Sequence, residues 1–283
     1  MAMEYLVPKT LNETLILLKK GKDKSKLIAG GTNVIPGMRA KTLKPEILID
    51  ISHLKNLSYI KEEKKRIRIG SLTTISELAS SKLIQNYAPI ISQAANQLGN
   101  PLVRNRATIA GNLADASPAA DTAVPLLVLD AMVMAERDGG KHREIPIDQF
   151  FLGPNQTVLK PDEMIREIVF PKPDPKSKMA YIKLGLRNAM AISVVSIAIL
   201  MEREREECKK VRIALGAVAP KPIRAYGVEA ILTNKKIMME LVAACCEKVG
   251  REMNPISDIR ASAEYRRSMA SVLLKRVLHQ MIS

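Results

Sequence analysis

Two short glycine-containing segments carry the residue types that can bind a phosphate-bearing ligand. Ala29–Asn33 reads Ala-Gly-Gly-Thr-Asn, and Thr108–Asn112 reads Thr-Ile-Ala-Gly-Asn. Each follows a β-prone stretch, and glycine allows positive φ and a close approach of the backbone to a ligand. Closely spaced backbone N–H groups in such loops bind anions, so the pair favours a diphosphate. Either segment taken alone is also compatible with an ordinary turn.

Hydroxyl and amide side chains accompany the glycines in both segments. Thr32 and Asn33 lie in the first, and Thr108 and Asn112 lie in the second. These groups suit a ligand that carries phosphates and sugar hydroxyls. The sequence has no GxxxxGK(S/T) motif and no GxGxxG motif at the start of a helix, which argues against a P-loop or a Rossmann site.

Length and composition indicate a globular chain. Its 283 residues, 47% of them hydrophobic, can bury a sizeable core in two domains or in one large one. The longest apolar candidate, Ala189–Met201, contains serines and is too short to span a membrane. The first residues show no basic segment followed by an apolar stretch, so we expect no secretory signal and a cytoplasmic location.

Residue types that bind metals are few, and their spacing matches no ligand set. Without a CxxC or HExxH pattern, we predict neither an iron–sulfur cluster nor another metal in this chain, and the histidines are expected at the surface or in the core. The residues concerned are Cys208, Cys245, Cys246, His53, His142 and His279.

The formal net charge of +15 invites a nucleic-acid interpretation. The excess is spread along the chain, with its densest clusters at Lys61–Arg68 and Lys172–Lys178, and aromatic residues make up only 3%. Stacking platforms for bases are therefore scarce. Solvated lysines or docking to acidic partner subunits explain the charge with fewer assumptions, so we predict no nucleic-acid partner.

Periodicity predicts an N-terminal lobe around the first segment. Thr10 and Glu13 form a capping-box pattern for a helix over 11–20. Strand-like stretches over 26–28 and 46–51 lead into and follow the Gly-Gly loop.

A second lobe is predicted after it. Alternation around Ile67 and Ile69 indicates a strand, Thr74 and Glu77 repeat the capping pattern, and Pro89 starts a helix that Gly99 ends. Further along, Asp121 is a candidate cap for a helix through Leu129, and segments 131–136 and 141–145 flank Asp138–Gly140 as a hairpin.

Three prolines in Phe170–Pro175 discourage both a helix and a central strand, so we expect a linker and a domain boundary there. Beyond it lie a strand-like segment over 179–183, a mixed segment over 194–201, and a segment over 211–218. A terminal amphipathic helix is expected to carry Met269, Val272, Leu273 and Val277.

The glycine segments also resemble known signatures. Leu27–Arg39 and Arg106–Asp121 are similar to the two FAD-binding signatures of the flavoprotein subunits of molybdenum hydroxylases, a family that includes the medium subunits of carbon monoxide dehydrogenase and bacterial xanthine dehydrogenase. Lys183–Arg187, Gly216–Arg224 and Ser262–Arg266 match family patterns in the same order. The resemblance therefore covers nearly the whole chain.

This resemblance implies an α+β fold. A two-lobed FAD-binding domain of the p-cresol methylhydroxylase/vanillyl alcohol oxidase type is expected over 1–172, with lobes of about 1–55 and 56–172, followed by a smaller α+β domain over 177–283. In the family, the first signature holds the FAD diphosphate and the second contacts its diphosphate, ribityl and adenosine portions. The implied cofactor-binding residues are Ile28, Ala29, Gly30, Gly31, Thr32, Asn33, Thr108, Gly111, Asn112, Ser117 and Asp121.

The resemblance also implies residues near the flavin ring. Leu98 and Ile165 would pack close to it, although both also read as plain core. Lys183 matches a lysine that stabilises negative charge on reduced flavin and is the catalytic candidate, with a solvated strand position as the alternative. Arg187 is a weaker candidate. Asp121 suits ribose hydroxyls as well as the helix cap.

The implied role is electron transfer within a complex. A small subunit with a 2Fe-2S cluster would deliver electrons to FAD, which would pass them to NAD+ or another soluble acceptor, while a molybdopterin-binding large subunit oxidises the substrate. A flavin-free structural subunit and a self-contained flavin oxidase are the alternatives.

The chain departs from the family pattern at two places. One is Ala110, where glycine is usual and a methyl group narrows backbone freedom; the other is Met190–Ile192, which lacks the acidic residue often found there.

Overall fold

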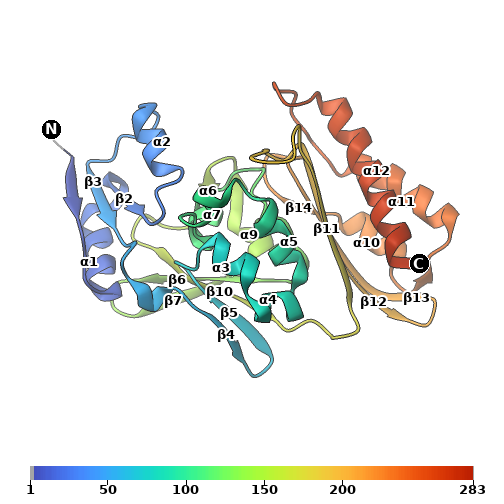
Figure 1. The fold of residues 1–283 in the computed structure, drawn as a ribbon, viewed down its shortest axis with the longest axis horizontal. Helices are drawn as coiled ribbons and strands as arrows, with labels where there is room; N and C mark the ends of the chain where they lie inside the picture. Colours follow the sequence, from blue (N-terminus) through green and yellow to red (C-terminus); the bar gives the residue numbers. More distant parts are fainter. Residues whose placement is uncertain (1–2, 283) are drawn as a thin grey trace.

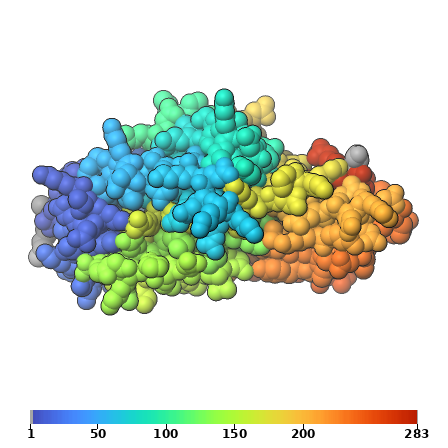
Figure 2. All heavy atoms as spheres, turned by 90° about the horizontal axis from the view of Figure 1, so that it is seen from below, coloured from blue at the N-terminus to red at the C-terminus, as the bar shows by residue number. Residues whose placement is uncertain are grey.

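The computed structural model describes residues 3–282 of the chain. Three main sheets follow one another along its long axis, with the N-terminus at one end and the C-terminal helices at the other (Figure 1). The surface view shows the same succession from blue to red (Figure 2). None of the helices within residues 3–282 is long and apolar enough to cross a membrane.

The first sheet is parallel and has the order β1-β3-β2. Its strands are linked by helical crossovers, as parallel pairing requires. The elements are β1 (Glu4–Leu6), α1 (Leu11–Gly21), η1 (Lys22–Lys24), β2 (Ser25–Ile28), α2 (Val34–Arg39), β3 (Ile47–Asp50) and η2 (Lys55–Leu57).

The second sheet is antiparallel and has the order β4-β5-β10-β6-β7. Its strands are β4 (Ile60–Glu63), β5 (Arg66–Gly70), β6 (Met132–Arg137), β7 (Lys141–Pro146) and β10 (Met164–Pro171). The helices of this part are α3 (Ile75–Ser80), α4 (Lys82–Tyr87), α5 (Pro89–Gln97), α6 (Pro101–Arg104), α7 (Ile109–Ala114), α8 (Ala123–Val128) and α9 (Ile147–Phe150). Strands β8 (Phe151–Gly153) and β9 (Gln156–Thr157) form a separate pair.

The third sheet packs between two layers of helices. Its main strands are β11 (Lys178–Leu184), β12 (Val195–Glu204), β13 (Glu207–Gly216) and β14 (Ile223–Arg224), and the short β15 (Lys235–Lys236) pairs with β13. The outer layer consists of α10 (Tyr226–Leu232), α11 (Met239–Arg251) and α12 (Ala263–Ile282) (Figure 1). On the inner side, α5 contacts β11 and α8 contacts β12 and β13.

Strand alternation divides the third sheet between two cores. Ala198 and Leu200 belong to the core of the middle part, whereas Ile197 and Ile199 belong to the C-terminal core. Successive side chains of a strand point to opposite faces. The third sheet is therefore packed directly against the part of the chain that precedes it.

Several local predictions are confirmed. Helix α1 begins after Thr10, whose hydroxyl accepts the Glu13 N–H at 3.1 Å, although the Glu13 carboxylate bonds Lys9 N instead of Thr10 N. The capping box of Thr74 and Glu77 is complete in α3. The predicted strands and the hairpin around Asp138–Gly140 also form.

Two local predictions are wrong. Phe170 and Pro171 belong to the central strand β10, with Phe170 fully buried opposite Ile67, so the irregular segment starts only after Pro171. Proline is tolerated there because β6 pairs with β10 only as far as Val169, so the N–H that proline lacks interrupts no strand pairing on that side. Asp121 does not cap α8, since Thr122 is the N-cap residue and makes no side-chain capping bond.

Candidate cofactor site

Both glycine segments line one cavity of about 390 Å³, a size typical of small-molecule sites. The cavity lies where the parallel N-terminal part meets the middle part of the chain. Among the residues predicted from the sequence, those on its wall are Ala29, Gly30, Gly31, Thr32, Asn33, Leu98, Thr108, Gly111, Asn112 and Ile165.

The first loop, Ala29–Asn33, offers free main-chain donors. Among residues 3–282, the N–H groups of Gly30 through Asn33 have no hydrogen-bond acceptor. Gly31 adopts a φ of +73°, a conformation that favours glycine. Consecutive N–H groups left open in this way form a concave site for an anion.

Close packing joins the first loop to the chain just before the second. A Cβ built on Gly30 would lie 1.8 Å from the carbonyl oxygen of Arg106. Backbone atoms cannot yield as a flexible side chain can, so only glycine fits at position 30. The two loops are therefore held in one fixed arrangement.

The second loop, Thr108–Asn112, differs from the first because the main-chain N–H groups of Ile109 through Asn112 are occupied. It forms the first turn of α7, so the prediction of open N–H groups in both loops is wrong for this one. Ala110 lies within this helix, where an alanine is accommodated without strain. The donor–acceptor pairs are Ile109 N to Thr73 O (3.0 Å), Ala110 N to Ser71 O (3.3 Å), Gly111 N to Thr108 Oγ1 (3.2 Å) and Asn112 N to Thr108 O (2.9 Å).

The second loop contributes side chains to the wall instead. Asn112 accepts a hydrogen bond from the Thr122 hydroxyl at 2.6 Å through Oδ1. This bond fixes the orientation of the amide and leaves its N–H groups available to a ligand.

Ser71 is a wall residue that the sequence reasoning missed. It is 1% exposed, and its hydroxyl has no hydrogen-bond partner among the described residues. A buried hydroxyl without a partner is costly, and a ligand in the cavity would supply one. The available signal was its position, directly after β5 and before the Thr73–Thr74 pair.

Glu163 is a second missed wall residue. Its carboxylate accepts hydrogen bonds from Arg143 at 2.8 and 2.9 Å and from Lys160 N at 2.9 Å. Burial opposes ionisation, but these donors outweigh it and hold the pKa of Glu163 below its usual range. The buried, ionised carboxylate of Glu163 is thus fixed in place on one side of the cavity.

Four of the predicted residues do not line the cavity. Ile28 is buried at the end of β2, and Ser117 accepts the Ala119 N–H at 3.2 Å. Asp121 and Lys183 form a buried ion pair of 2.7 Å. The alternative of a solvated Lys183 is therefore wrong, since its side chain is 4% exposed.

The pair of Asp121 and Lys183 lies directly behind the wall. The Lys183 ammonium also donates to Gln97 O at 3.0 Å, and Gln97 precedes the wall residue Leu98. Tyr181 and Ser193 donate to the Asp121 carboxylate at 3.2 and 2.7 Å. Burial and the nearby carboxylate raise the pKa of Tyr181 well above its usual value, so it stays a hydrogen-bond donor.

Arg187 lies outside the cavity. Its guanidinium donates to Met190 O at 2.9 Å within the exposed β11–β12 loop. The segment Met190–Ile192 belongs to the same loop.

Comparison with known proteins agrees with this geometry. Residues 1–173 match the FAD-binding domain in molybdopterin dehydrogenase, and residues 180–281 match the CO dehydrogenase flavoprotein C-terminal domain. The chain therefore belongs to the family of FAD-binding subunits of molybdenum hydroxylases. Its cofactor is FAD, and the predicted α+β fold class is confirmed.

Individual relatives match nearly the whole chain. The chain is 33% identical to the carbon monoxide dehydrogenase medium chain of Hydrogenophaga pseudoflava, covering 98% of this chain and 96% of the relative. It is 31% identical to the xanthine dehydrogenase FAD-binding subunit of Escherichia coli O157:H7, covering 97% and 94%. A solved structure of carbon monoxide dehydrogenase from Hydrogenophaga pseudoflava superimposes with a TM-score of 0.95 over 99% of this chain and 96% of that one.

Proposed function

We propose that this chain is the electron-transfer subunit of a cytoplasmic molybdopterin-containing dehydrogenase. It receives electrons from a subunit with a 2Fe-2S cluster and delivers them to NAD+ or another soluble acceptor, while a large subunit with molybdopterin oxidises the substrate. Bound FAD supplies the conversion between single electrons and the two electrons and one proton that NAD+ takes up as hydride. Relatives that are named as subunits of dehydrogenase complexes support this role.

The open donors of Gly30–Asn33 are the observation that carries the proposal. Four main-chain N–H groups without acceptors in the described part of the chain fit the anionic diphosphate of FAD, and the Ser71 hydroxyl and the Asn112 amide are further partners for its polar atoms. Leu98 and Ile165 supply apolar wall suited to the flavin ring. The proposed domains are the FAD-binding domain over residues 1–172 and the C-terminal domain over residues 177–283.

Lys183 and Asp121 have a positioning role in this proposal. Their ion pair joins β11 to the segment before α8 and, through Gln97 O, to the wall at Leu98. The ammonium also contributes a positive charge behind the wall, although the adjacent carboxylate offsets most of it. Ile28 packs next to Gly31 of the first loop.

Flavin spectroscopy on the full-length chain tests the proposal. After incubation with FAD and removal of excess, the protein should retain flavin absorbance; dithionite should bleach it, and NAD+ should restore it. Retained flavin that responds neither to NAD+ nor to a soluble dye acceptor contradicts the electron-transfer role. A chain that retains no FAD contradicts the cofactor assignment and favours a structural subunit.

Copurification tests the partners. A tagged chain expressed in its source organism should isolate together with a subunit that contains molybdopterin and one that contains a 2Fe-2S cluster. Isolation of the chain without either subunit contradicts the proposed complex.

A further inference from the structure

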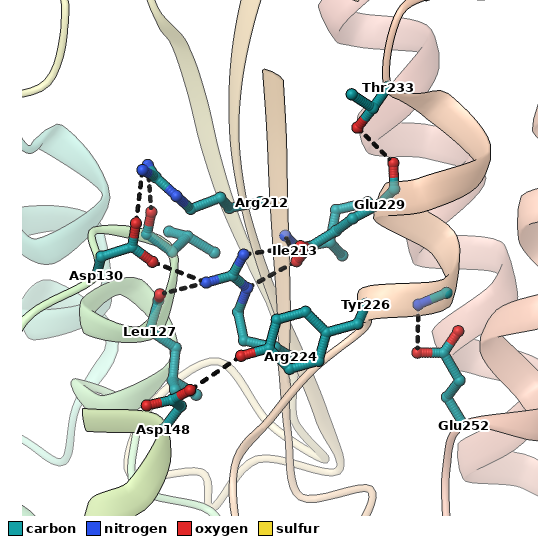
Figure 3. A network of polar contacts seen from close by, with 12 residues as sticks. Leu127, Asp130, Asp148, Arg212, Ile213, Arg224, Tyr226, Glu229, Thr233 and Glu252 are labelled. Carbon is teal, nitrogen blue, oxygen red and sulfur yellow. Dashed lines mark hydrogen bonds and ion pairs between the residues drawn. The ribbon is translucent and has the colours of Figure 1, made fainter. Parts of the chain in front are cut away.

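Two arginines of the third sheet hold the carboxyl end of α8 (Figure 3). Arg224 Nη1 lies 3.3 Å from Leu127 O, and Arg212 Nη1 lies 3.3 Å from Val128 O. The last carbonyls of a helix lack intrahelical donors, and cations there stabilise it. Asp130, which follows α8 with a φ of +48°, pairs with Arg212 at 2.6 Å and with Arg224 at 2.9 Å.

Arg224 is itself fixed on its other side. Its Nε and Nη2 each donate to the Glu229 carboxylate at 2.7 Å, and Glu229 also accepts the Ile213 N–H at 2.8 Å (Figure 3). The side chains of Arg224 and Glu229 are 9% and 10% exposed. A bidentate pair this well buried has a single geometry, so the guanidinium is a rigid contact for α8.

The amino end of α8 reaches the cofactor cavity. Thr122, directly before the helix, donates to the wall residue Asn112 at 2.6 Å. The six buried residues Ala123–Val128 separate the two ends by about 9 Å. So short a helix is not stable by itself, so its position depends on the packing of its buried side chains against β12 and β13 and on the contacts at its two ends.

We infer that Arg224, together with Arg212, is a positioning residue for the cofactor cavity and acts through α8 and Thr122 on Asn112. Neither arginine lines the cavity. Without the arginine contacts, the carboxyl end of α8 is held less firmly. This loosens the Thr122 contact and leaves the Asn112 amide less well oriented. The inference rests on the proposed function, because the ligand whose affinity it sets is FAD.

The test compares Arg224→Met with Tyr226→Phe in the full-length chain. Tyr226 donates to Asp148 at 3.0 Å and so spans the same boundary, and the phenylalanine keeps the ring that lies 5.0 Å from the Arg224 guanidinium. Two readouts are measured: hydrogen exchange of the amides of residues 109–114 without FAD, and the Kd for FAD. Arg224→Met should speed exchange and raise Kd by about twofold to thirtyfold, whereas Tyr226→Phe should change neither.

Unchanged exchange and Kd in folded Arg224→Met protein overturn the inference. If that variant does not fold, Arg224→Lys, which keeps the charge but loses the bidentate contact, is judged by the same criterion. In Arg224→Met protein, adding Thr122→Val should raise the Kd for FAD little beyond the larger of the two single-variant effects. Fully additive effects of the two substitutions on the Kd overturn the route through Thr122. A wild-type chain that binds no FAD contradicts the proposed function. The hydrogen-exchange measurement then still tests whether Arg224 positions α8.

Discussion

The loops Ala29–Asn33 and Thr108–Asn112 line the same cavity but use their main-chain donors differently. In the first, the N–H groups of Gly30 through Asn33 have no acceptor among residues 3–282; in the second, Thr73 O, Ser71 O and Thr108 accept from the N–H groups of Ile109 through Asn112. Similar glycine motifs thus give an anion-binding turn in one place and a closed helical turn in the other. Neighbouring carbonyl groups, rather than the glycines, decide which donors remain for a ligand.

The substitution Gly30→Ala should have the largest effect on this arrangement. The new Cβ would meet the Arg106 carbonyl at 1.8 Å and force the loops apart, so we expect loss of FAD binding and destabilisation by roughly 2 kcal/mol or more. Titration with FAD and thermal unfolding measure both effects.

Gly139→Ala is the matched control for that change. Gly139 has a φ of +80° in the β6–β7 turn, with no atom within 4 Å of a built Cβ. It should cost about 1 kcal/mol and leave the Kd for FAD unchanged. A wild-type Kd for FAD in Gly30→Ala protein would contradict the proposed difference between the two loops.

The substitution Thr108→Ala sharpens the comparison at the second loop. Its hydroxyl caps α7 by accepting the Gly111 N–H at 3.2 Å, so we expect a loss of about 1 kcal/mol and a several-fold weaker affinity for FAD. Thr10→Ala removes an equivalent cap from α1 and should cost the same stability without affecting FAD. Equal Kd values for the two variants would contradict a role for this turn in shaping the wall.

The substitution Ser71→Ala should separate ligand binding from stability. Because the buried hydroxyl has no partner among the described residues, its removal should leave the FAD-free chain as stable or up to about 1 kcal/mol more stable, while FAD binds more weakly. Ser177→Ala, which removes another unpartnered hydroxyl away from the cavity, should not alter FAD affinity. Weaker binding by both variants to the same extent would rule out a specific contact.

The smallest expected effect is a pH dependence from Glu163. Its pKa is lowered in the folded chain, so its stabilising contribution is present above the ordinary pKa of about 4.3 and is lost as the pH falls through the lowered value. On acidification, the wild-type chain should lose more thermal stability than Glu163→Gln. Parallel losses in the two proteins would contradict the prediction.

Local sequence signals foretold much of the fold. The capping residues Thr10 and Thr74, the helix start at Pro89 and the alternation around Ile67 depend on neighbours within a few positions, and these elements form as predicted. Strand β10 extended further than expected, since its pairing with β5 outweighs the proline at its end.

The candidate site was less predictable because it depends on distant contacts. Nothing near Lys183 in the sequence reveals its ion pair with Asp121, because Asp121 lies 62 residues earlier, in the segment before α8. The occupied N–H groups of the second loop likewise depend on the carbonyls of Ser71 and Thr73, from which α3, α4, α5 and α6 separate it in the chain. The glycine motifs predicted that both loops line one ligand site. The hydrogen bonds of the folded chain were needed to show that the first loop offers main-chain donors and the second offers side chains.

Amide chemical shifts measured during ligand titration test the central claim most directly. With isotope-labelled full-length chain, FAD should shift the Gly30, Gly31, Thr32 and Asn33 N–H resonances strongly downfield, as expected for donors that gain a phosphate acceptor, and riboflavin, which has no phosphate, should not. Stoichiometric FAD binding that leaves these four resonances in place, or equal shifts with riboflavin, would contradict a diphosphate held by the first loop.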